Sequence, residues 1–200
     1  MKKIILASKS PDRKKILEDL GIPFEIYITN VNEEMYKGEI TDPIELAMKL
    51  AETKAIEAKK NLEELNQDAI IIGADTIVEV KGEIIGKAFN EEGAFNIIKK
   101  LRGKTHNLIT GIAITESNQS KLIIDYDLTT VEFLYLSEDE IWHYINTNEW
   151  KGRAGAYSIM DRASLFINRI IGSTSNVIGL PMHKINKILK SEFEINLIQI

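Results

Sequence analysis

One acidic residue stands inside an apolar segment near the middle of the chain. Asp75 follows the β-branched run 69–72 and precedes a second apolar pair at 77–78. An ionised carboxylate in such a pattern is costly to bury unless a positive group meets it. Lys87 stands in a comparable place, directly after the strand-like stretch 84–86. An acid and a base that each follow a strand predict a site for a metal ion and phosphate. The alternative is a turn in which Asp75 bonds its own backbone.

A second group of candidate residues surrounds a predicted helix start. Residues 3–7 are typical of a buried strand, and Ser10 with Pro11 is typical of a helix N-terminus, with Ser at the N-cap and Pro in the first turn. The unpaired backbone N–H groups of a helix start attract anions. Ser8 and Arg13 lie beside that start. We predict a phosphate-binding loop here, with a solvated basic helix face as the alternative.

Further strands and helices alternate along the rest of the chain. The predicted elements are strands at 24–28, 107–115, 121–136 and 166–171, and helices that begin at 42–43, 90, 137 and after 181. The runs 107–115 and 121–136 predict a long antiparallel hairpin. Glu33 and Glu34 are predicted to lie in a loop. Lys54 borders the apolar stripe of the helix that begins at 42–43, where most lysines are solvated.

Composition excludes several classes of function. The 200 residues show no linker or repeat, so we expect a single domain over 1–200. The net charge of −5 comes from interspersed acids and bases, which argues against a nucleic-acid-binding surface. The chain has no cysteine, and its three histidines lack metal-ligand spacing. No apolar run is long enough to cross a membrane, and the basic, then apolar start is too short for a signal peptide. We therefore expect a cytoplasmic protein.

Several short motifs occur together in a characteristic order. They are Leu6-Ala7-Ser8-Lys9-Ser10-Pro11 with Arg13, Lys54-Ala55, Gly73-Ala74-Asp75-Thr76-Ile77-Val78, Gly86-Lys87, Leu101-Arg102-Gly103 with His106, Lys151-Gly152-Arg153-Ala154-Gly155-Ala156-Tyr157, and Gly179-Leu180-Pro181. Each is weak alone. In this order and spacing they resemble the Maf family of nucleoside triphosphate pyrophosphatases, within the inosine-triphosphatase-like superfamily.

The resemblance implies a fold and an activity. The implied fold is α/β, with a mixed, bent sheet flanked by helices and two lobes around a central cleft. The implied reaction is hydrolysis of a nucleoside triphosphate, such as dTTP, UTP or a modified nucleotide, to the monophosphate and pyrophosphate. A divalent cation, Mg²⁺ or Mn²⁺, is the implied cofactor, and a homodimer is a family-level expectation.

The resemblance also implies roles for individual residues. Asp75 matches the general base, and Asp75 with Glu34 matches the acidic positions at the cation. The positions that match catalytic or triphosphate-binding groups are Ser8, Ser10, Arg13, Lys54 and Lys87. Thr76 matches a position tied to substrate choice.

Two departures from the family pattern affect substrate selection. Asp12 replaces an arginine next to Arg13, and it places negative charge near the predicted anion site. Met160 replaces a glutamine, and methionine cannot offer the paired amide hydrogen bonds that glutamine offers to a pyrimidine. These departures favour one alternative, a non-catalytic nucleotide-binding regulator of cell division. A second alternative is an enzyme of the inosine-triphosphatase branch that acts on deaminated purines.

Overall fold

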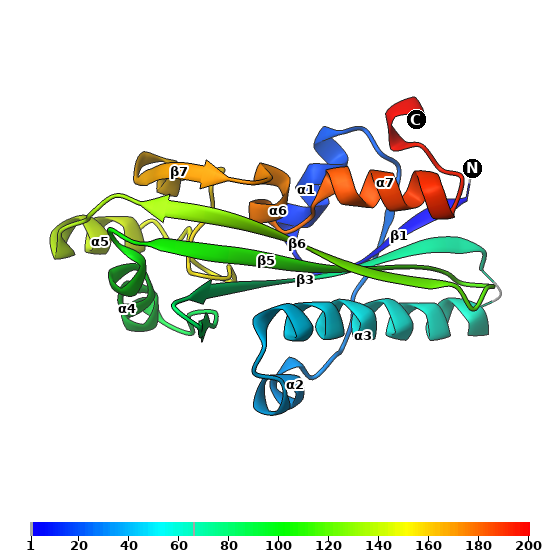
Figure 1. Cartoon of the computed structure of the whole chain (residues 1–200), viewed down its shortest axis with the longest axis horizontal. Helices are drawn as coiled ribbons and strands as arrows, with labels where there is room; N and C mark the ends of the chain where they lie inside the picture. Colours follow the sequence, from blue (N-terminus) through cyan, green and yellow to red (C-terminus); the bar gives the residue numbers. More distant parts are fainter. Residues whose placement is uncertain (1, 66) are drawn as a thin grey trace. The chain divides into compact units, whose positions relative to one another are not determined.

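The computed structural model describes residues 2–65 and 67–200, and Met1 and Asn66 lie outside the described residues. The strands are β1 (Lys3–Ala7), β2 (Glu25–Tyr27), β3 (Ala69–Val80), β4 (Glu83–Ile85), β5 (Thr105–Glu116), β6 (Leu122–Phe133) and β7 (Ile167–Ile171). The α-helices are α1 (Pro11–Asp19), α2 (Glu33–Glu39), α3 (Pro43–Glu64), α4 (Glu91–Leu101), α5 (Glu138–Ile145), α6 (Thr174–Ile178) and α7 (Met182–Glu192). The predicted α/β class is confirmed (Figure 1).

The strands form one mixed sheet in the order β2-β1-β3-β5-β6-β7, with β4 paired to β3. β1 pairs in parallel with both β2 and β3, whereas the β3–β4 and β6–β7 pairs are antiparallel. β5 and β6 are neighbours joined by a short turn at 117–121, so they form the predicted antiparallel hairpin.

The chain divides into two compact units. The first contains the described residues of 1–75, with 110–127 and 179–200, and the second contains 76–109 and 128–178. The three 12-residue strands β3, β5 and β6 each contribute residues to both units. Among the described residues, no helix is long and apolar enough to span a membrane.

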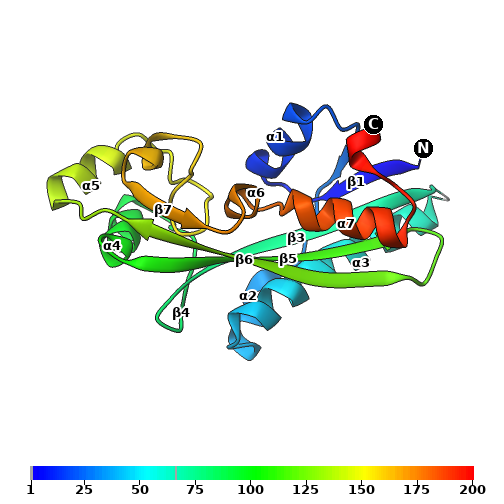
Figure 2. The ribbon, with the colours of Figure 1, turned by 45° about the horizontal axis from the view of Figure 1, so that its top comes forward.

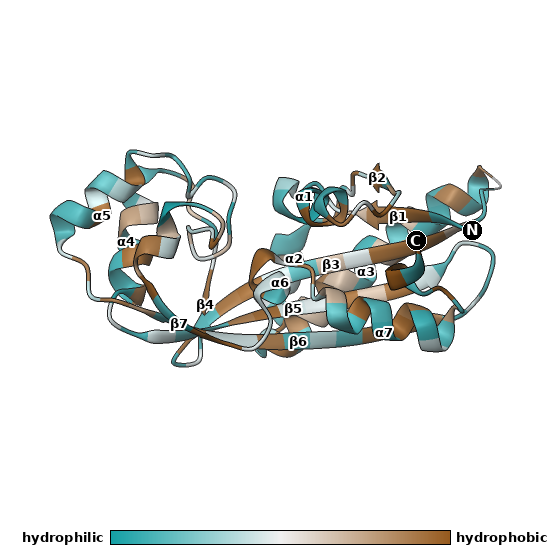
Figure 3. Cartoon of the chain, turned by 90° about the horizontal axis from the view of Figure 1, so that it is seen from above, coloured by the Kyte–Doolittle hydropathy of each residue, from teal (hydrophilic) through white to brown (hydrophobic). Residues whose placement is uncertain are grey.

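In the first unit, helices cover both faces of the sheet (Figures 1 and 2). α3 packs on the face formed by Ile5 and Ile71, and it contributes a row of buried alanines that includes Ala51 and Ala55. α1 and α7 pack on the opposite face, where Ile72 is buried. Because strand side chains alternate between faces, residues of β3 with odd numbers point toward α3. Figure 3 shows the apolar colouring of β1, which lies between β2 and β3 in the sheet.

Two glycines allow α3 to lie unusually close to the sheet. A Cβ atom built on Gly73 of β3 would overlap the Ala51 carbonyl oxygen and lie 2.9 Å from the Ala55 backbone nitrogen. A Cβ atom on Gly111 of β5 would overlap the Ala47 carbonyl group in the same helix. The absent side chains therefore set the height of α3 above β3 and β5.

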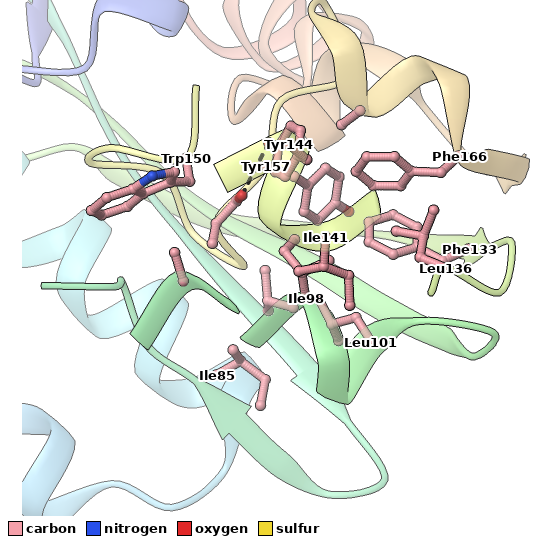
Figure 4. Packing of buried hydrophobic residues seen from close by; sticks show 14 of the residues in the cluster. Ile85, Ile98, Leu101, Phe133, Leu136, Ile141, Tyr144, Trp150, Tyr157 and Phe166 are labelled. Carbon is pink, nitrogen blue, oxygen red and sulfur yellow. Dashed lines mark hydrogen bonds between the residues drawn. The ribbon is translucent and has the colours of Figure 1, made fainter. Parts of the chain in front are cut away.

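The second unit has its own core, in which aromatic rings pack among aliphatic side chains (Figure 4). The Phe133 ring contacts Tyr157 and Phe166 edge to face, with centroid distances of 4.8 and 5.0 Å. Tyr144 contacts Phe166 in the same way at 5.1 Å. Edge-to-face contacts of this kind stabilise a core beyond the area they bury.

The helix starts were predicted correctly. Ser10, Asp42 and Asn90 each accept a hydrogen bond from a backbone N–H of the first turn, and Ser137 with Glu140 forms a complete capping box. Two predictions were wrong. Asp75 lies inside β3 instead of after a strand end, and Glu33 and Glu34 begin the short helix α2 instead of lying in a loop.

Candidate active site

Asp75 lies on the α3 side of β3, where it meets Lys54. The Lys54 Nζ atom donates to Asp75 Oδ1 at 2.6 Å, and it donates to Glu33 Oε1 at 2.7 Å. The side chains of Lys54 and Asp75 are only 9% and 10% exposed. A buried carboxylate needs a positively charged partner. Here that partner is Lys54 of α3, the helix that can pack close to β3 because Gly73 has no side chain.

This contact excludes the turn alternative for Asp75. The residue lies in continuous strand between Ala74 and Thr76, and its carboxylate faces a lysine 21 positions away in the sequence. Lys54 is likewise 7% exposed as a whole residue, so it is not an ordinary solvated helix lysine. The structure thus brings together two of the predicted catalytic residues.

Arg13 joins three distant segments of the first unit. Its Nε atom donates to the Gly179 carbonyl oxygen at 2.7 Å, and its Nη1 atom donates to Ser8 Oγ at 3.1 Å and to the Ala74 carbonyl oxygen at 2.9 Å. Arg13 is only 7% exposed. Burial lowers the pKa of the Arg13 guanidinium, and the nearby carboxylates of Asp75, Glu33 and Asp12 act in the opposite direction.

The loop before α1 is organised by its two serines. Ser8 Oγ accepts from the Ser10 backbone N–H at 3.2 Å, and Ser10 Oγ accepts from the Arg13 backbone N–H at 3.4 Å. Ser8 is buried, while Ser10 is partly exposed at the helix N-terminus. Three predicted phosphate-binding residues, Ser8, Ser10 and Arg13, therefore belong to one hydrogen-bonded loop. Asp12 lies in the first turn of the same helix.

Glu33 shares the Lys54 ammonium with Asp75. The sequence did not single out Glu33 as a site residue. Its neighbour Glu34 has a side chain that is 76% exposed and pairs with Lys37 at 2.6 Å. Adjacent glutamates on a helix point in different directions, so only one of the two can face α3. No spacing rule distinguishes Glu33 from Glu34, because the choice depends on how α2 packs against α3.

The remaining candidates lie in the second unit. Lys87 is exposed, and its backbone bridges Ala154 of the glycine-rich loop. Thr76 is partly buried, and it points to the face of β3 opposite Asp75. Met160 is 56% exposed, and its backbone N–H donates to Ser158 Oγ at 3.2 Å. Convergence of these three residues with Asp75 stays a prediction.

The Glu33 and Asp75 carboxylates near Lys54 supply some of the oxygen ligands that a divalent cation requires. No group of three or more His, Cys, Asp or Glu side chains within 2–65 and 67–200 is arranged to hold a metal ion. Asp75 and Glu33 nevertheless both direct a carboxylate oxygen to one Lys54 nitrogen. Mg²⁺ is commonly held by one or two carboxylates together with substrate phosphates. Two carboxylates beside the predicted phosphate-binding loop fit such a shared site.

A match to the family model "Maf-like protein" spans residues 3–192. The chain belongs to the Maf family. A relative from Alkaliphilus oremlandii, named dTTP/UTP pyrophosphatase, is 43% identical over 198 residues, which cover 99% of this chain and 100% of the relative. Relatives of the same name from Thermoanaerobacter sp. and Clostridioides difficile are each 40% identical, and the matches cover 98% and 97% of this chain and 100% and 97% of the relatives.

A solved structure from Mycobacterium abscessus, titled nucleoside-triphosphatase / dITP/XTP pyrophosphatase, is 12% identical to this Maf-family chain. The match covers 66% of this chain and 72% of the solved chain, with a TM-score of 0.36.

The second unit of this Maf-family chain also buries a histidine to which the sequence assigned no role. His106 is 1% exposed, and its Nε2 atom lies 2.8 Å from the Tyr157 hydroxyl oxygen. Burial lowers the pKa of His106 to about 4, and burial also raises the pKa of Tyr157. The pair is therefore neutral near pH 7 and belongs to the aromatic core. The aromatic residues that surround His106 (Phe133 and Tyr157) are far from it in sequence. No local sequence pattern could therefore have revealed that His106 is buried.

Proposed function

We propose that this chain is a nucleoside triphosphate pyrophosphatase that converts an NTP or dNTP to the monophosphate and pyrophosphate. The observation that carries this proposal is the buried Asp75 carboxylate, which contacts Lys54 beside the loop of Ser8, Ser10 and Arg13. Membership of the Maf family and the names of the relatives support dTTP and UTP as substrates. We include modified nucleotides of similar size in the proposal.

The reaction adds one water molecule to the triphosphate. The bond between phosphorus and the oxygen that bridges the α- and β-phosphates breaks, and a new phosphorus–oxygen bond forms to the water oxygen. We assign Asp75 to orient this water and accept its proton, because a carboxylate within hydrogen-bonding reach of a water acts as a general base. No covalent intermediate is required. The chain has no cysteine that could act as a nucleophile. In the described residues, the hydrogen-bond partners of Ser8 and Ser10 include no side chain that could take a proton, because the Arg13 guanidinium that contacts Ser8 is already protonated.

The positive groups would neutralise the triphosphate and stabilise the departing pyrophosphate. We assign this role to Lys54 and Arg13 in the first unit and to Lys87 in the second. Ser10 and the backbone N–H groups at the start of α1 would donate to phosphate oxygens. Arg13 has the additional role of holding the Ala74 and Gly179 backbones, because two of its three nitrogens already donate to protein groups.

A divalent cation, Mg²⁺ or Mn²⁺, would supply further charge neutralisation on the phosphates when bound. Asp75 is the first protein group we assign to it. The sequence predicted Glu34 as the second, and the geometry favours Glu33, which shares Lys54 with Asp75. Both carboxylates offer the oxygen ligands that these cations prefer.

Base preference would depend on Asp12, Thr76 and Met160. Met160 presents an exposed thioether where an amide would offer two hydrogen-bonding groups. A site without such paired bonds discriminates less sharply between bases. We therefore propose a broader pyrimidine nucleotide range than a glutamine at position 160 would allow.

The test is pyrophosphate release from a nucleotide panel with Mg²⁺, comparing wild type with Asp75→Asn. The panel contains dTTP, UTP, CTP, ITP, XTP and a modified uridine nucleotide. We expect Asp75→Asn to lower kcat by about 100-fold or more, the usual contribution of a positioned base. Asp19→Asn, which removes a surface carboxylate paired with Lys15, is the matched control and should retain full activity.

The outcomes of this test decide the role of Asp75 and the function of the chain. Equal rates for wild type and Asp75→Asn would eliminate Asp75 as the base. Saturable nucleotide binding without pyrophosphate release would select the non-catalytic regulator. A clear preference for ITP or XTP over UTP would select the deaminated-purine branch.

A further inference from the structure

The ammonium group of Lys54 occupies the position between Glu33 and Asp75. Its Nζ atom lies 2.7 Å from the first carboxylate and 2.6 Å from the second, and its side chain is 9% exposed. A lysine ammonium has three donors, and two of them already point at carboxylates. Lys54 is therefore a strongly held monovalent cation at the place where two acidic side chains meet.

The charges of this cluster are balanced within the first unit. Glu33, Asp75 and Asp12 supply three negative charges, and Lys54, Arg13 and Lys37 supply three positive charges. A divalent cation gains the full attraction of the two carboxylates only if a positive group leaves. Arg13 is tied to the Ser8, Ala74 and Gly179 segments through two of its nitrogens, whereas Lys54 contacts Glu33 and Asp75 through its terminal ammonium.

Lys54 is the group that can change partner. Its four-carbon stem is flexible, and its ammonium is a compact point charge that can rotate to a new acceptor. Its backbone belongs to a helix that packs closely on β3, where Gly73 lies against Ala51. A phosphate placed near the helix start of α1 would offer that ammonium a doubly charged acceptor in place of the carboxylates.

We propose that Lys54 is an exchangeable internal cation that competes with the divalent metal ion for Glu33 and Asp75. Without nucleotide, its ammonium keeps the two carboxylates paired and weakens metal binding. With nucleotide, the ammonium moves to a phosphate oxygen and the carboxylates become available to the metal ion. Metal and nucleotide then strengthen each other's binding reciprocally. This inference rests on the proposed function for the identity of the nucleotide.

The competing explanation is that Lys54 is a fixed structural ion pair. In that case its removal leaves two adjacent carboxylates without altering a metal site, or disrupts the fold. Nucleotide phosphates are themselves metal ligands, so positive coupling in the wild type alone does not identify Lys54. The decisive quantity is the affinity for metal ion without nucleotide when the Lys54 charge is absent.

The experiment measures free Mn²⁺ by electron paramagnetic resonance during titration of the full chain. Wild type, Lys54→Met and Lys54→Arg are compared, first without nucleotide and then with the α,β-methylene analogue of UTP. The stability of the Mn²⁺–analogue complex is measured in a protein-free blank and included in the fit. Lys49→Met is the matched control, because Lys49 lies on the same helix and pairs with Glu52 at 2.8 Å.

We expect Lys54→Met to bind Mn²⁺ without nucleotide at least about tenfold more tightly than wild type, because a charge next to two carboxylates has been removed. The analogue should raise the Mn²⁺ affinity of wild type by a larger factor than that of Lys54→Met. Lys54→Arg keeps the competing charge and should bind Mn²⁺ within about threefold of wild type. Lys49→Met should match wild type in both titrations.

An affinity of Lys54→Met for Mn²⁺ that is equal to or weaker than that of wild type overturns the inference. If Lys54→Met does not fold, Lys54→Gln takes its place. If neither folds, the inference is overturned in favour of a structural ion pair. Pyrophosphate release from the hydrolysable nucleotide panel is measured separately on the same protein preparations. Turnover by wild type with no effect of Lys54 on Mn²⁺ affinity rejects this inference alone, and the Lys54 effect without turnover of any nucleotide rejects the proposed function alone.

Discussion

Gly73 lies directly beneath Ala51 of α3, so close that a single methyl group on Gly73 would overlap the Ala51 carbonyl oxygen. This approach places the next helical turn, which carries Lys54, over Asp75. The ion pair between Lys54 and Asp75 therefore depends on the absence of a Cβ atom at Gly73, two residues before Asp75 in β3.

Gly73→Ala should test this dependence. Overpacking against helix backbone costs about 1–3 kcal/mol or more, because the backbone cannot rotate away as a side chain can. We expect that loss in urea unfolding, together with lower pyrophosphatase activity, because α3 must rise from the sheet. Gly38→Ala is the matched control: no atom lies within 4 Å of the added methyl group, and the position is helical. It should stabilise the chain slightly.

Arg13→Lys should separate charge from hydrogen-bonding geometry. Lysine retains the positive charge but cannot bond Ser8, Ala74 and Gly179 together. Buried carbonyl groups that lose a charged donor cost about 2–4 kcal/mol in total, so urea unfolding should show a loss of that size. Arg162→Lys, at a surface arginine, should change stability by less than about 0.5 kcal/mol. A similar small change for Arg13→Lys would argue against its positioning role.

Glu33→Gln and Glu34→Gln should separate the two assignments of the second carboxylate. Glu33 contacts Lys54, whereas Glu34 is paired with Lys37 at the surface. We expect Glu33→Gln to lower kcat/KM for UTP by about tenfold or more, since it removes one charge from the cluster, and Glu34→Gln to have the smaller effect. Steady-state pyrophosphate release measures both. The reverse order would restore the assignment to Glu34.

His106 should make stability depend on pH. Its pKa is about 4 in the folded chain and has the ordinary value near 6.5 in the unfolded chain. Between these values the unfolded chain binds more protons, so the free energy of unfolding falls as the pH falls. From pH 7 to pH 5 the loss is about 2 kcal/mol.

Urea unfolding at a series of pH values checks this slope. His106→Gln should lose most of it, whatever its stability at pH 7. His143→Gln should keep it, because His143 is exposed on α5 with a side chain that is 78% accessible. An unchanged slope in His106→Gln would assign the pH dependence to other groups.

The sequence was most informative where local chemistry decides the structure. Ser10, Asp42 and Ser137 mark helix starts because each cap is formed within three or four residues. Asp75 was placed at a strand end because Gly73 and Ala74 have weak strand preference. The structure continues β3 through them, since small residues are required there by a helix that is distant in sequence. Glu33 was missed for the same reason, because its role depends on the packing of α2 against α3.

The first unit is assembled from three separate stretches of chain, and the last of them begins at Gly179. This last stretch buries Leu180 and, from α7, Ile185 and Leu189 against the sheet that holds Ile72. During synthesis this apolar surface stays uncovered until after the second unit has been made. A nascent chain that stops before Gly179 would therefore leave the Ile72 face of the sheet without its α7 cover, and such products are expected to aggregate or to require a chaperone.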